Sequence, residues 1–183
     1  MDSPFELQRT AAYALIVHDG QILLTRISRR GHHTGHWTLP GGGVDHGEHP
    51  LETVRREVYE ETGLHAAIGS VLGVHHTHFV GTAPNGRVED YHGIHLVFAA
   101  DVRDRESVRV TEDGGTTDAA AWIPIASLDD QPVLDVVRYA AGLLPDFLPP
   151  SERLLPPSGP LDPPLGEGPR SSLGSPSENS SSM

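Results

Sequence analysis

Cysteine is absent from all 183 residues of the chain. Its absence excludes disulfide bonds, thiol nucleophiles and metal sites built on thiolates. A chain without cysteine fits a reducing compartment, and we therefore expect a cytoplasmic protein.

Positive charge is also scarce, because 13 Lys and Arg residues stand against 25 Asp and Glu residues, which leaves a net charge of −12. This excess of acid disfavours binding to a nucleic-acid polymer or to an anionic membrane. The longest apolar run, residues 11–17, is too short to span a bilayer. The first residues show no basic segment followed by an apolar one, so no secretory signal is predicted.

Aromatic residues end at Phe147, and ten of the sixteen prolines lie from Pro145 onward. Such a composition predicts a disordered tail over residues 145–183, which is either a solvated extension or a proline-rich docking segment. The length of the chain favours one domain. We place that domain at residues 11–144, after a short extension over residues 1–10.

Short runs of Val, Ile and Leu alternate with Gly, Asn and Asp in the body of the chain, which is typical of strands joined by tight turns. Two hairpins are predicted, one around Asp19-Gly20 and one around Asn85-Gly86. Their strands are expected at residues 11–18, 21–27, 71–81 and 88–99, with a further strand at 119–124. Helices are predicted at residues 50–63 and 127–144. Strands on both sides of a central helix predict a mixed α/β fold.

The first predicted helix gathers acid on one side, because Glu57, Glu60 and Glu61 are spaced by three and four residues. An apolar stripe lies about a quarter turn away and can face a core. Adjacent carboxylates raise one another's pKa because their negative charges repel, and a bound cation removes this repulsion. Hard oxygen ligands favour Mg²⁺, with Mn²⁺ as an alternative. A solvated acidic face, partly paired with Arg55 and Arg56, is the other interpretation of an isolated E-x-x-E-E pattern.

The residues around this helix favour the metal site. Gly41, Gly42 and Gly43 allow close backbone approach to the acidic face. Glu48 lies one turn before the helix, where it can pair with Arg56. The stretch from Gly42 to Leu64 matches Gly-x5-Glu-x7-Arg-Glu-U-x-Glu-Glu-x-Gly-U at every specified position, with U aliphatic. It resembles the signature of the Nudix hydrolases.

This resemblance implies an α/β/α sandwich around a mixed sheet and an enzyme that cleaves a diphosphate linkage in a nucleotide by water attack at phosphorus. It implies metal ligation by Glu57, Glu60, Glu61 and the carbonyl of Gly41, and structural roles for Glu48 and Arg56. The metal would neutralise the diphosphate and activate water. The alternative within the family is a domain that binds nucleotides without cleaving them. Members of that kind often lose signature carboxylates, and this chain keeps all of them.

The general base and the substrate contacts are less determined. In some Nudix hydrolases a signature glutamate takes the proton from water, and here we expect Glu57 or Glu60. In others a later loop supplies the carboxylate, and the candidates are Glu112, Asp113 and Asp118. The expected substrate contacts are Arg26, Gly41 and Gly42, although Arg26 also fits a solvated strand position. Trp37 fits either base stacking or packing, and packing is favoured.

Histidine is frequent, with 12 residues. A two-residue turn at Asn85-Gly86 would set His76 opposite His95, with His78 on the same face. Such a cluster is either a transition-metal or phosphate site or a partly wet sheet face, and the second is favoured.

Comparison with specialised Nudix relatives narrows the substrate only in part. The isopentenyl diphosphate isomerases need a cysteine, messenger-RNA decapping members need a basic surface, and the segments that mark NADH, ADP-ribose and coenzyme-A hydrolases are missing or incomplete. Nucleoside triphosphates, nucleotide sugars and other nucleotide diphosphates remain as substrates. Many relatives form homodimers, and nothing in the sequence marks an interface.

Overall fold

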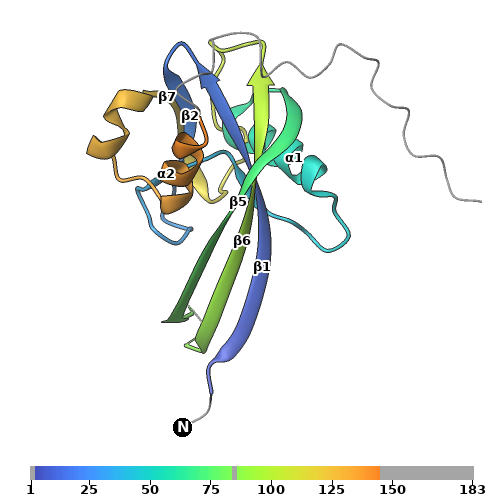
Figure 1. The fold of residues 1–183 in the computed structure, drawn as a ribbon, viewed down its shortest axis with the longest axis vertical. Coiled ribbons are helices and arrows are strands. Elements are labelled where there is room, and N and C mark those ends of the chain that lie inside the picture. The colour runs from blue at the N-terminus through green and yellow to red at the C-terminus, as the bar shows by residue number, and fades with distance from the viewer. Residues whose placement is uncertain (1–2, 84–85, 145–183) are drawn as a thin grey trace, which may run out of the picture.

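The computed structural model describes residues 3–83 and 86–144. Seven strands, two α-helices and one 3-10 helix follow one another along this part of the chain (Figure 1). They are β1 (Phe5–His18), β2 (Gln21–Ile27), β3 (Trp37–Thr38), β4 (Gly41–Gly43), α1 (Pro50–Thr62), β5 (Ala66–Thr82), β6 (Val88–Val102), β7 (Thr117–Pro124), the 3-10 helix (Ile125–Asp130) and α2 (Asp135–Gly142). The predicted disordered tail lies outside the described residues.

The strands form one mixed sheet in the order β3-β2-β1-β6-β5, with β4 paired to β1 and β7 paired to β2. The β1–β6 pair is parallel, and the other pairs are antiparallel. Helix α1 covers one face of the sheet, and α2 with the 3-10 helix covers the other (Figure 1). The predicted mixed α/β sandwich is confirmed.

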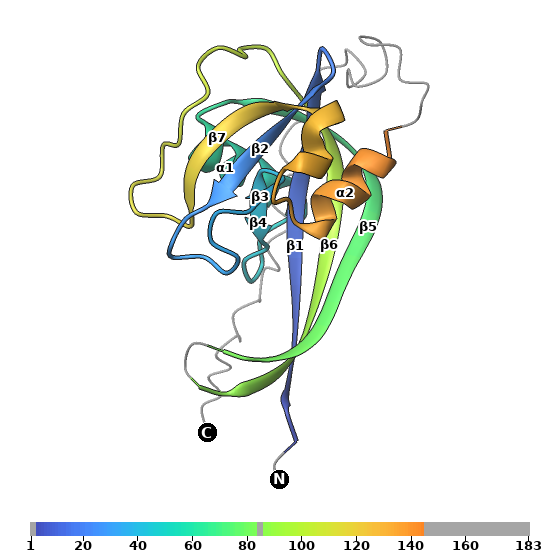
Figure 2. The ribbon, with the colours of Figure 1, turned by 90° about the vertical axis from the view of Figure 1, so that its left-hand side faces the viewer.

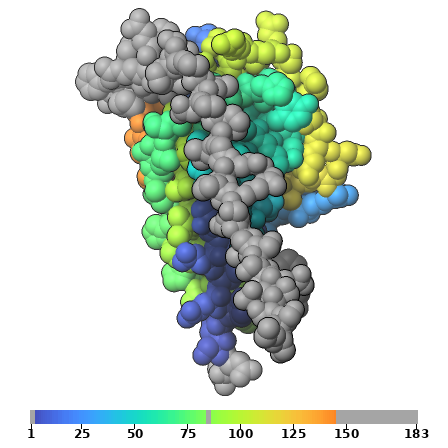
Figure 3. Space-filling view, turned by 90° about the vertical axis from the view of Figure 1, so that its right-hand side faces the viewer, coloured from blue at the N-terminus to red at the C-terminus, as the bar shows by residue number. Residues whose placement is uncertain are grey.

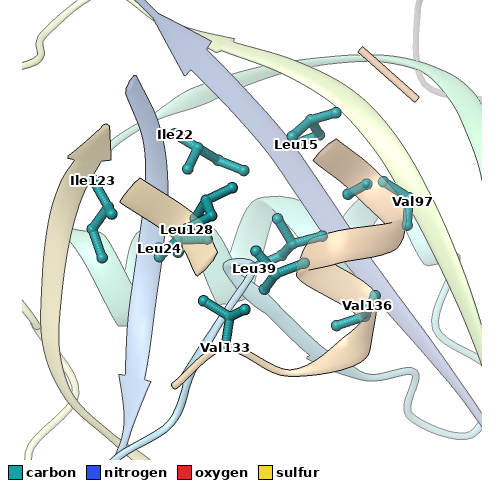
Figure 4. Packing of buried hydrophobic residues seen from close by; sticks show 11 residues of the cluster. Leu15, Ile22, Leu24, Leu39, Val97, Ile123, Leu128, Val133 and Val136 are labelled. Carbon is teal, nitrogen blue, oxygen red and sulfur yellow. The ribbon is translucent and has the colours of Figure 1, made fainter. Parts of the chain in front are cut away.

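Each face of the sheet has its own apolar cluster. Val54 and Val58 of α1 are fully buried against one face, together with Leu23 of β2. The other cluster joins β1, β2 and β6 to α2 and the 3-10 helix (Figure 4). Its labelled members are Leu15, Ile22, Leu24, Leu39, Val97, Ile123, Leu128, Val133 and Val136. Burial of the side chains in both clusters supplies most of the free energy that favours folding. The cluster that contains Val54 and Val58 fixes the position of α1 on the sheet.

Strands β1, β6 and β5 extend beyond the helices as a three-stranded arm (Figures 1 and 2). Here β1 begins at Phe5, six residues before the predicted start of the strand. Its first residues pair with the start of β6, from Phe5 opposite Glu89 onward. In the space-filling view, the first part of β1 lies at the surface of this arm (Figure 3). Pairing with β6, rather than the apolar pattern of its own residues, therefore determines where β1 starts.

The first hairpin has the predicted turn, because Asp19 and Gly20 both have positive φ, at 47° and 72°. The second hairpin is present, but its predicted register is wrong. Ala83 N–H donates to Arg87 O, so three residues lie between the last bonded pair instead of two. Consequently His75, and not His76, lies opposite His95.

The predicted cluster of His76, His78 and His95 is therefore wrong, because a shift of one residue exchanges the faces of a strand. His75 and His95 share one face, with their Nδ1 atoms 3.1 Å apart. Burial lowers the pKa of His95 to about 4, and the neighbouring His75 adds to this effect. His76, His78 and His92 lie on the opposite face, where His78 Nε2 is 2.6 Å from a carboxylate oxygen of Asp90. Both groups are thus held by contacts with other side chains of β5 and β6.

The predicted helix at residues 127–144 is wrong in its middle, where an extended segment separates the 3-10 helix from α2. Pro132 has no N–H for a helix, and its carbonyl accepts a 2.8 Å hydrogen bond from Trp37 N–H. Leu134 N–H in turn donates to Trp37 O at 2.9 Å. Pairing with β3 thus outweighs the local helical pattern. Within residues 3–83 and 86–144, neither α-helix is long and apolar enough to cross a membrane.

Candidate active site

Helix α1 presents the signature glutamates toward the start of β4. Pro50 occupies its first turn, the His49 side chain accepts from Leu51 N–H, and Gly63 ends the helix with φ of 71°. Because Val54 and Val58 face the sheet, the glutamates one quarter turn away lie at the edge of the packed interface. The helix therefore holds acid where the core meets solvent.

Glu61 is the most buried of the three, with 5% of its surface exposed. Its carboxylate accepts hydrogen bonds from Gly41 N–H at 2.9 Å, from the Thr25 hydroxyl at 3.3 Å and from the Thr117 hydroxyl. Burial, with a smaller contribution from the charge of Glu57, raises the pKa of Glu61 to about 7, although these hydrogen bonds oppose the rise. Strands β2 and β7 and the start of β4 thus all contribute to the surroundings of this one carboxyl group.

Two glycines let the backbone come close to the acidic face. Gly41 has a φ of 145°, and a Cβ there would lie 2.3 Å from Ala12 O. A Cβ on Gly42 would lie 2.6 Å from Glu57 Oε1. Any other residue at these positions would push β4 away from β1 or displace the Glu57 carboxylate.

Arg56 joins the loop before the helix to the acidic face. Its guanidinium donates to Glu48 at 3.0 Å and 3.1 Å, to Glu57 at 2.8 Å and to Glu60 at 3.1 Å. The bonds from Arg56 and Thr53 lower the pKa of Glu48 to about 2. Burial raises the pKa of Glu57, against the lowering effect of Arg56. Glu48 and Arg56 therefore lie where they brace the loop against the helix.

The three glutamates do not close around a common point. Within the described ranges, 3–83 and 86–144, no three His, Asp or Glu side chains are arranged so that they could hold a metal ion. The contacts explain why: Glu57 and Glu60 turn toward Arg56, whereas Glu61 turns toward Gly41 and the two threonines. The negative charge of Glu57 and Glu60 is thus offset by the guanidinium of Arg56.

The donor set nevertheless fits a hard cation. The charge of Glu57 disfavours ionisation of Glu61, an effect that a dication would reverse. Within the part of the chain that the structure describes, one buried side-chain polar atom has no hydrogen-bond partner, the hydroxyl oxygen of Thr38. Thr38 lies directly opposite Thr25, so both side chains are on the Glu61 face of the sheet. An unpartnered hydroxyl there suits the hydration shell of a metal ion.

A loop carboxylate also approaches this face. The backbone N–H groups of Thr111 and Glu112 donate to Glu60 O at 2.9 Å and 3.1 Å, which fixes the loop to the end of α1. The charge of Glu112 contributes to the raised pKa of Glu57. Asp118 is engaged elsewhere, in a 2.8 Å ion pair with Arg26. Of the three loop candidates, Glu112 is thus the one whose charge reaches a signature carboxylate.

Arg26 does not point toward the glutamates. Thr25 faces Glu61, so the next residue along the strand faces the other side of the sheet. There the Arg26 guanidinium lies 5.8 Å from the centre of the Trp37 ring, and Trp37 packs against the core cluster on that side. Residues 28–30, 114, 115, 117 and 118 line an open depression of about 330 Å³ beside this pair. Thr117 connects the depression to Glu61.

Thr25, Thr38 and Thr117 are the site residues that sequence reasoning missed. A sequence signal existed for Thr25 alone, because it follows Leu23 at the spacing of an inward-facing strand position and interrupts an apolar pattern. Thr38 and Thr117 reach the site only through strand pairing. Spacing within the sequence carries no information on that pairing.

Comparison with known proteins agrees with this geometry. The model of the NUDIX domain matches residues 7–147 of the chain. The chain belongs to the Nudix family. It is a Nudix-type nucleotide pyrophosphohydrolase, an enzyme that acts on acid anhydrides of phosphorus.

Three Nudix relatives illustrate the similarity. The nucleoside triphosphatase NudI of Escherichia coli O139:H28 is 35% identical over 109 residues, which cover 58% of this chain and 77% of that protein. The crystal structure of a MutT NUDIX hydrolase from Burkholderia pseudomallei is 30% identical with a TM-score of 0.60, over 75% of this chain and 98% of the other. The MutT protein from Methanosarcina mazei Go1 is 26% identical with a TM-score of 0.58, over 76% and 94%.

Proposed function

We propose that this Nudix hydrolase cleaves nucleoside triphosphates in a reaction that depends on Mg²⁺, with Mn²⁺ as a substitute. The observation that carries the proposal is the buried Glu61 carboxylate beside Glu57, since two such groups are costly to ionise without a cation. The 35% identity to a nucleoside triphosphatase supports the substrate class. The acidic surface is no obstacle, because metal and nucleotide charges offset each other.

Glu57, Glu60, Glu61 and the Gly41 carbonyl would hold the metal. When bound, it would polarise the phosphoryl oxygens and lower the pKa of an attacking water. Arg56 is already bonded to Glu57 and Glu60, so these carboxylates must exchange one cation for another when metal binds. Glu61 has no such contact and keeps its hydrogen bonds to Gly41 and Thr25.

Glu57 is our proposal for the general base. Its carboxylate lies against Gly42 of β4, and burial raises its pKa toward the working range of a base. It would take a proton from the water that adds to phosphorus while the bridging P–O bond breaks. The displaced oxygen leaves as pyrophosphate or as the nucleotide.

The depression described above is our proposed place for the phosphate chain, because Thr117, Arg29 and Arg30 are among the residues that line it. Arg26 and the Gly41-Gly42 backbone would then contact substrate from either side of the sheet edge. The Arg26–Asp118 pair would have to open for Arg26 to reach a phosphate.

A substrate panel tests the proposal. Nucleoside triphosphates, nucleotide sugars and other nucleotide diphosphates are incubated with the protein and Mg²⁺, and products are separated by anion-exchange chromatography. We expect nucleoside monophosphate and pyrophosphate from a triphosphate, and no turnover in EDTA. If a nucleotide bound but no compound of the panel were cleaved, the protein would instead be a nucleotide sensor. The complete set of signature carboxylates does not support that alternative.

The assignment of the base makes a separate prediction. Glu57→Gln is expected to lower kcat by about 10²- to 10⁴-fold, the usual contribution of general base catalysis. Glu112→Gln is expected to lower it far less, because Glu112 acts on Glu57 only through its charge. Asp113→Asn is the matched control from the same loop. Profiles of the rate against pH distinguish the two candidates for the general base. If Glu112→Gln, and not Glu57→Gln, removed the decrease in rate at low pH, the general base would be Glu112 of the loop.

The location remains a prediction. The absence of cysteine and of a described membrane-crossing helix fits the cytoplasm, which we propose as the compartment of this enzyme.

A further inference from the structure

We propose that β5 is the interface of a homodimer, in which β5 of one copy pairs antiparallel with β5 of a second copy around a two-fold axis at Thr77. The proposal concerns the arm and does not depend on the reaction. It rests on the edge position of β5, on its lack of charge and on its exposed apolar side chains.

Strand β5 lies at the end of the strand order, so among the described residues only β6 pairs with it (Figure 2). Its other edge presents a row of backbone N–H and C=O groups without a strand partner. Two register shifts distort its first part, between Ile68 and Gly73. From Gly73 to Thr82 the pairing is regular, and this segment can serve as a template for one more strand.

The regular part of β5, from Gly73 to Thr82, contains none of the usual protections of an open edge. Over Ala66–Thr82 the strand has no Asp, Glu, Lys, Arg or Pro, and its only ionisable side chains are three histidines. Natural sheets commonly guard such edges with lysine, proline or a bulge. In a chain of net charge −12, a strand of this length without a carboxylate stands apart from the rest of the surface.

Exposed apolar side chains concentrate on the same strand. Among the described residues, eight large apolar side chains are exposed, and five of them belong to β5. The five are Val71, Leu72, Val74, Phe79 and Val80. Val74 and Val80 are 53% and 59% exposed and lie on one face, because their positions differ by an even number. This concentration of exposed apolar side chains on one strand indicates an interaction surface.

The charge of the chain favours a second copy as the occupant. Two copies of a chain with a net charge of −12 repel each other overall, whereas the β5 strands themselves bring no carboxylate to the contact. A two-fold axis also makes the patch its own complement, so that no further surface is needed. A basic partner would instead be drawn to the acidic surfaces outside this strand.

The exposed valines select the register. Antiparallel pairing centred on Thr77 sets Val74 of each copy opposite Val80 of the other on one face. It sets His75 opposite Phe79 on the other face. Every side chain on the regular part of β5 then gains a cross-strand neighbour, the contact that stabilises sheets. The two three-stranded arms would form one continuous six-stranded sheet.

Sedimentation velocity tests the interface. We expect the wild-type protein to sediment as a dimer at micromolar concentration and Val74→Lys/Val80→Lys to sediment as a monomer with unchanged circular dichroism and unchanged turnover. Val88→Lys is the matched control, because Val88 is also exposed, at 48%, but lies on β6, which is not at the edge of the sheet. A monomeric wild type, or a dimer that survives the double substitution, would overturn the proposal.

The absence of cysteine allows a second test, since any introduced thiol is the only one in the chain. Under mild oxidation, Thr77→Cys is expected to form a disulfide-linked dimer, because directly opposed residues of antiparallel strands lie within disulfide range. Ser70→Cys is the control on the same strand, and in this register it lies about 45 Å from its counterpart. Cross-linking at position 70 and not at position 77 would contradict the pairing.

Discussion

Glu61→Gln is expected to remove nearly all hydrolytic turnover while the protein stays folded. The substitution keeps the size of the side chain and its bond from Gly41 N–H, but it removes the charge that a metal ion would meet. Losing several kcal/mol of metal-borne stabilisation corresponds to a decrease in kcat of about 10³-fold or more. The measurement is nucleoside monophosphate release at saturating substrate and Mg²⁺.

Glu52→Gln provides the control, because Glu52 lies in the first turn of the same helix and is exposed. We expect this variant to keep its turnover and its Mn²⁺ affinity, followed by electron paramagnetic resonance of the free ion. Glu61→Gln should lose most of that affinity. Full turnover in the Glu61 variant would show that this carboxylate does not act through a metal.

The same Glu61→Gln substitution is expected to stabilise the metal-free protein above pH 7. The pKa of Glu61 rises from 4.5 to about 7 on folding, chiefly through burial. The folded protein therefore binds more protons than the unfolded chain between these values, and its stability falls as pH rises through this window. The accumulated loss at pH 8 is on the order of 3 kcal/mol, which a neutral glutamine avoids.

Urea unfolding in EDTA at pH 5 and at pH 8 measures this difference. The wild type should lose stability relative to Glu61→Gln between the two values, and Mg²⁺ should restore much of it to the wild type alone. A variant that is less stable than the wild type at pH 8 without metal would contradict the prediction. Higher stability together with lost turnover would identify Glu61 as a residue kept for function at a cost in folding free energy.

Helix α1 could be predicted from sequence because its information is local. The period of Val54 and Val58, Pro50 at the start and Gly63 at the end all act within a few turns of chain. The spacing of Glu57, Glu60 and Glu61 likewise depends on helix geometry alone. The Asp19-Gly20 turn was predictable for the same reason.

What sequence reasoning missed depends on contacts between distant segments. The hydroxyls of Thr25 and Thr117 reach Glu61 only because β2 and β7 pair beside α1. The split of the last helix requires β3 to bond Pro132. The register between β5 and β6 depends on one extra residue in the turn, because of which His95 lies opposite His75 and not opposite His76. Each of these features is determined by pairing between segments that are distant in the sequence.

The parallel pairing of β1 with β6 has a consequence for how this chain is made. Phe5 pairs with Glu89 and Ile16 with Ala100. Strand β1 therefore cannot form these pairs until β6, which is synthesised much later, has left the ribosome. During that interval the β4 and α1 segments have been synthesised, but the surface on which α1 packs is incomplete, because it includes Phe98 and Ala100 of β6. Synthesis from the amino end thus delays closure of the catalytic centre until the β6 segment has emerged, and long-range pairing of this kind makes folding slow.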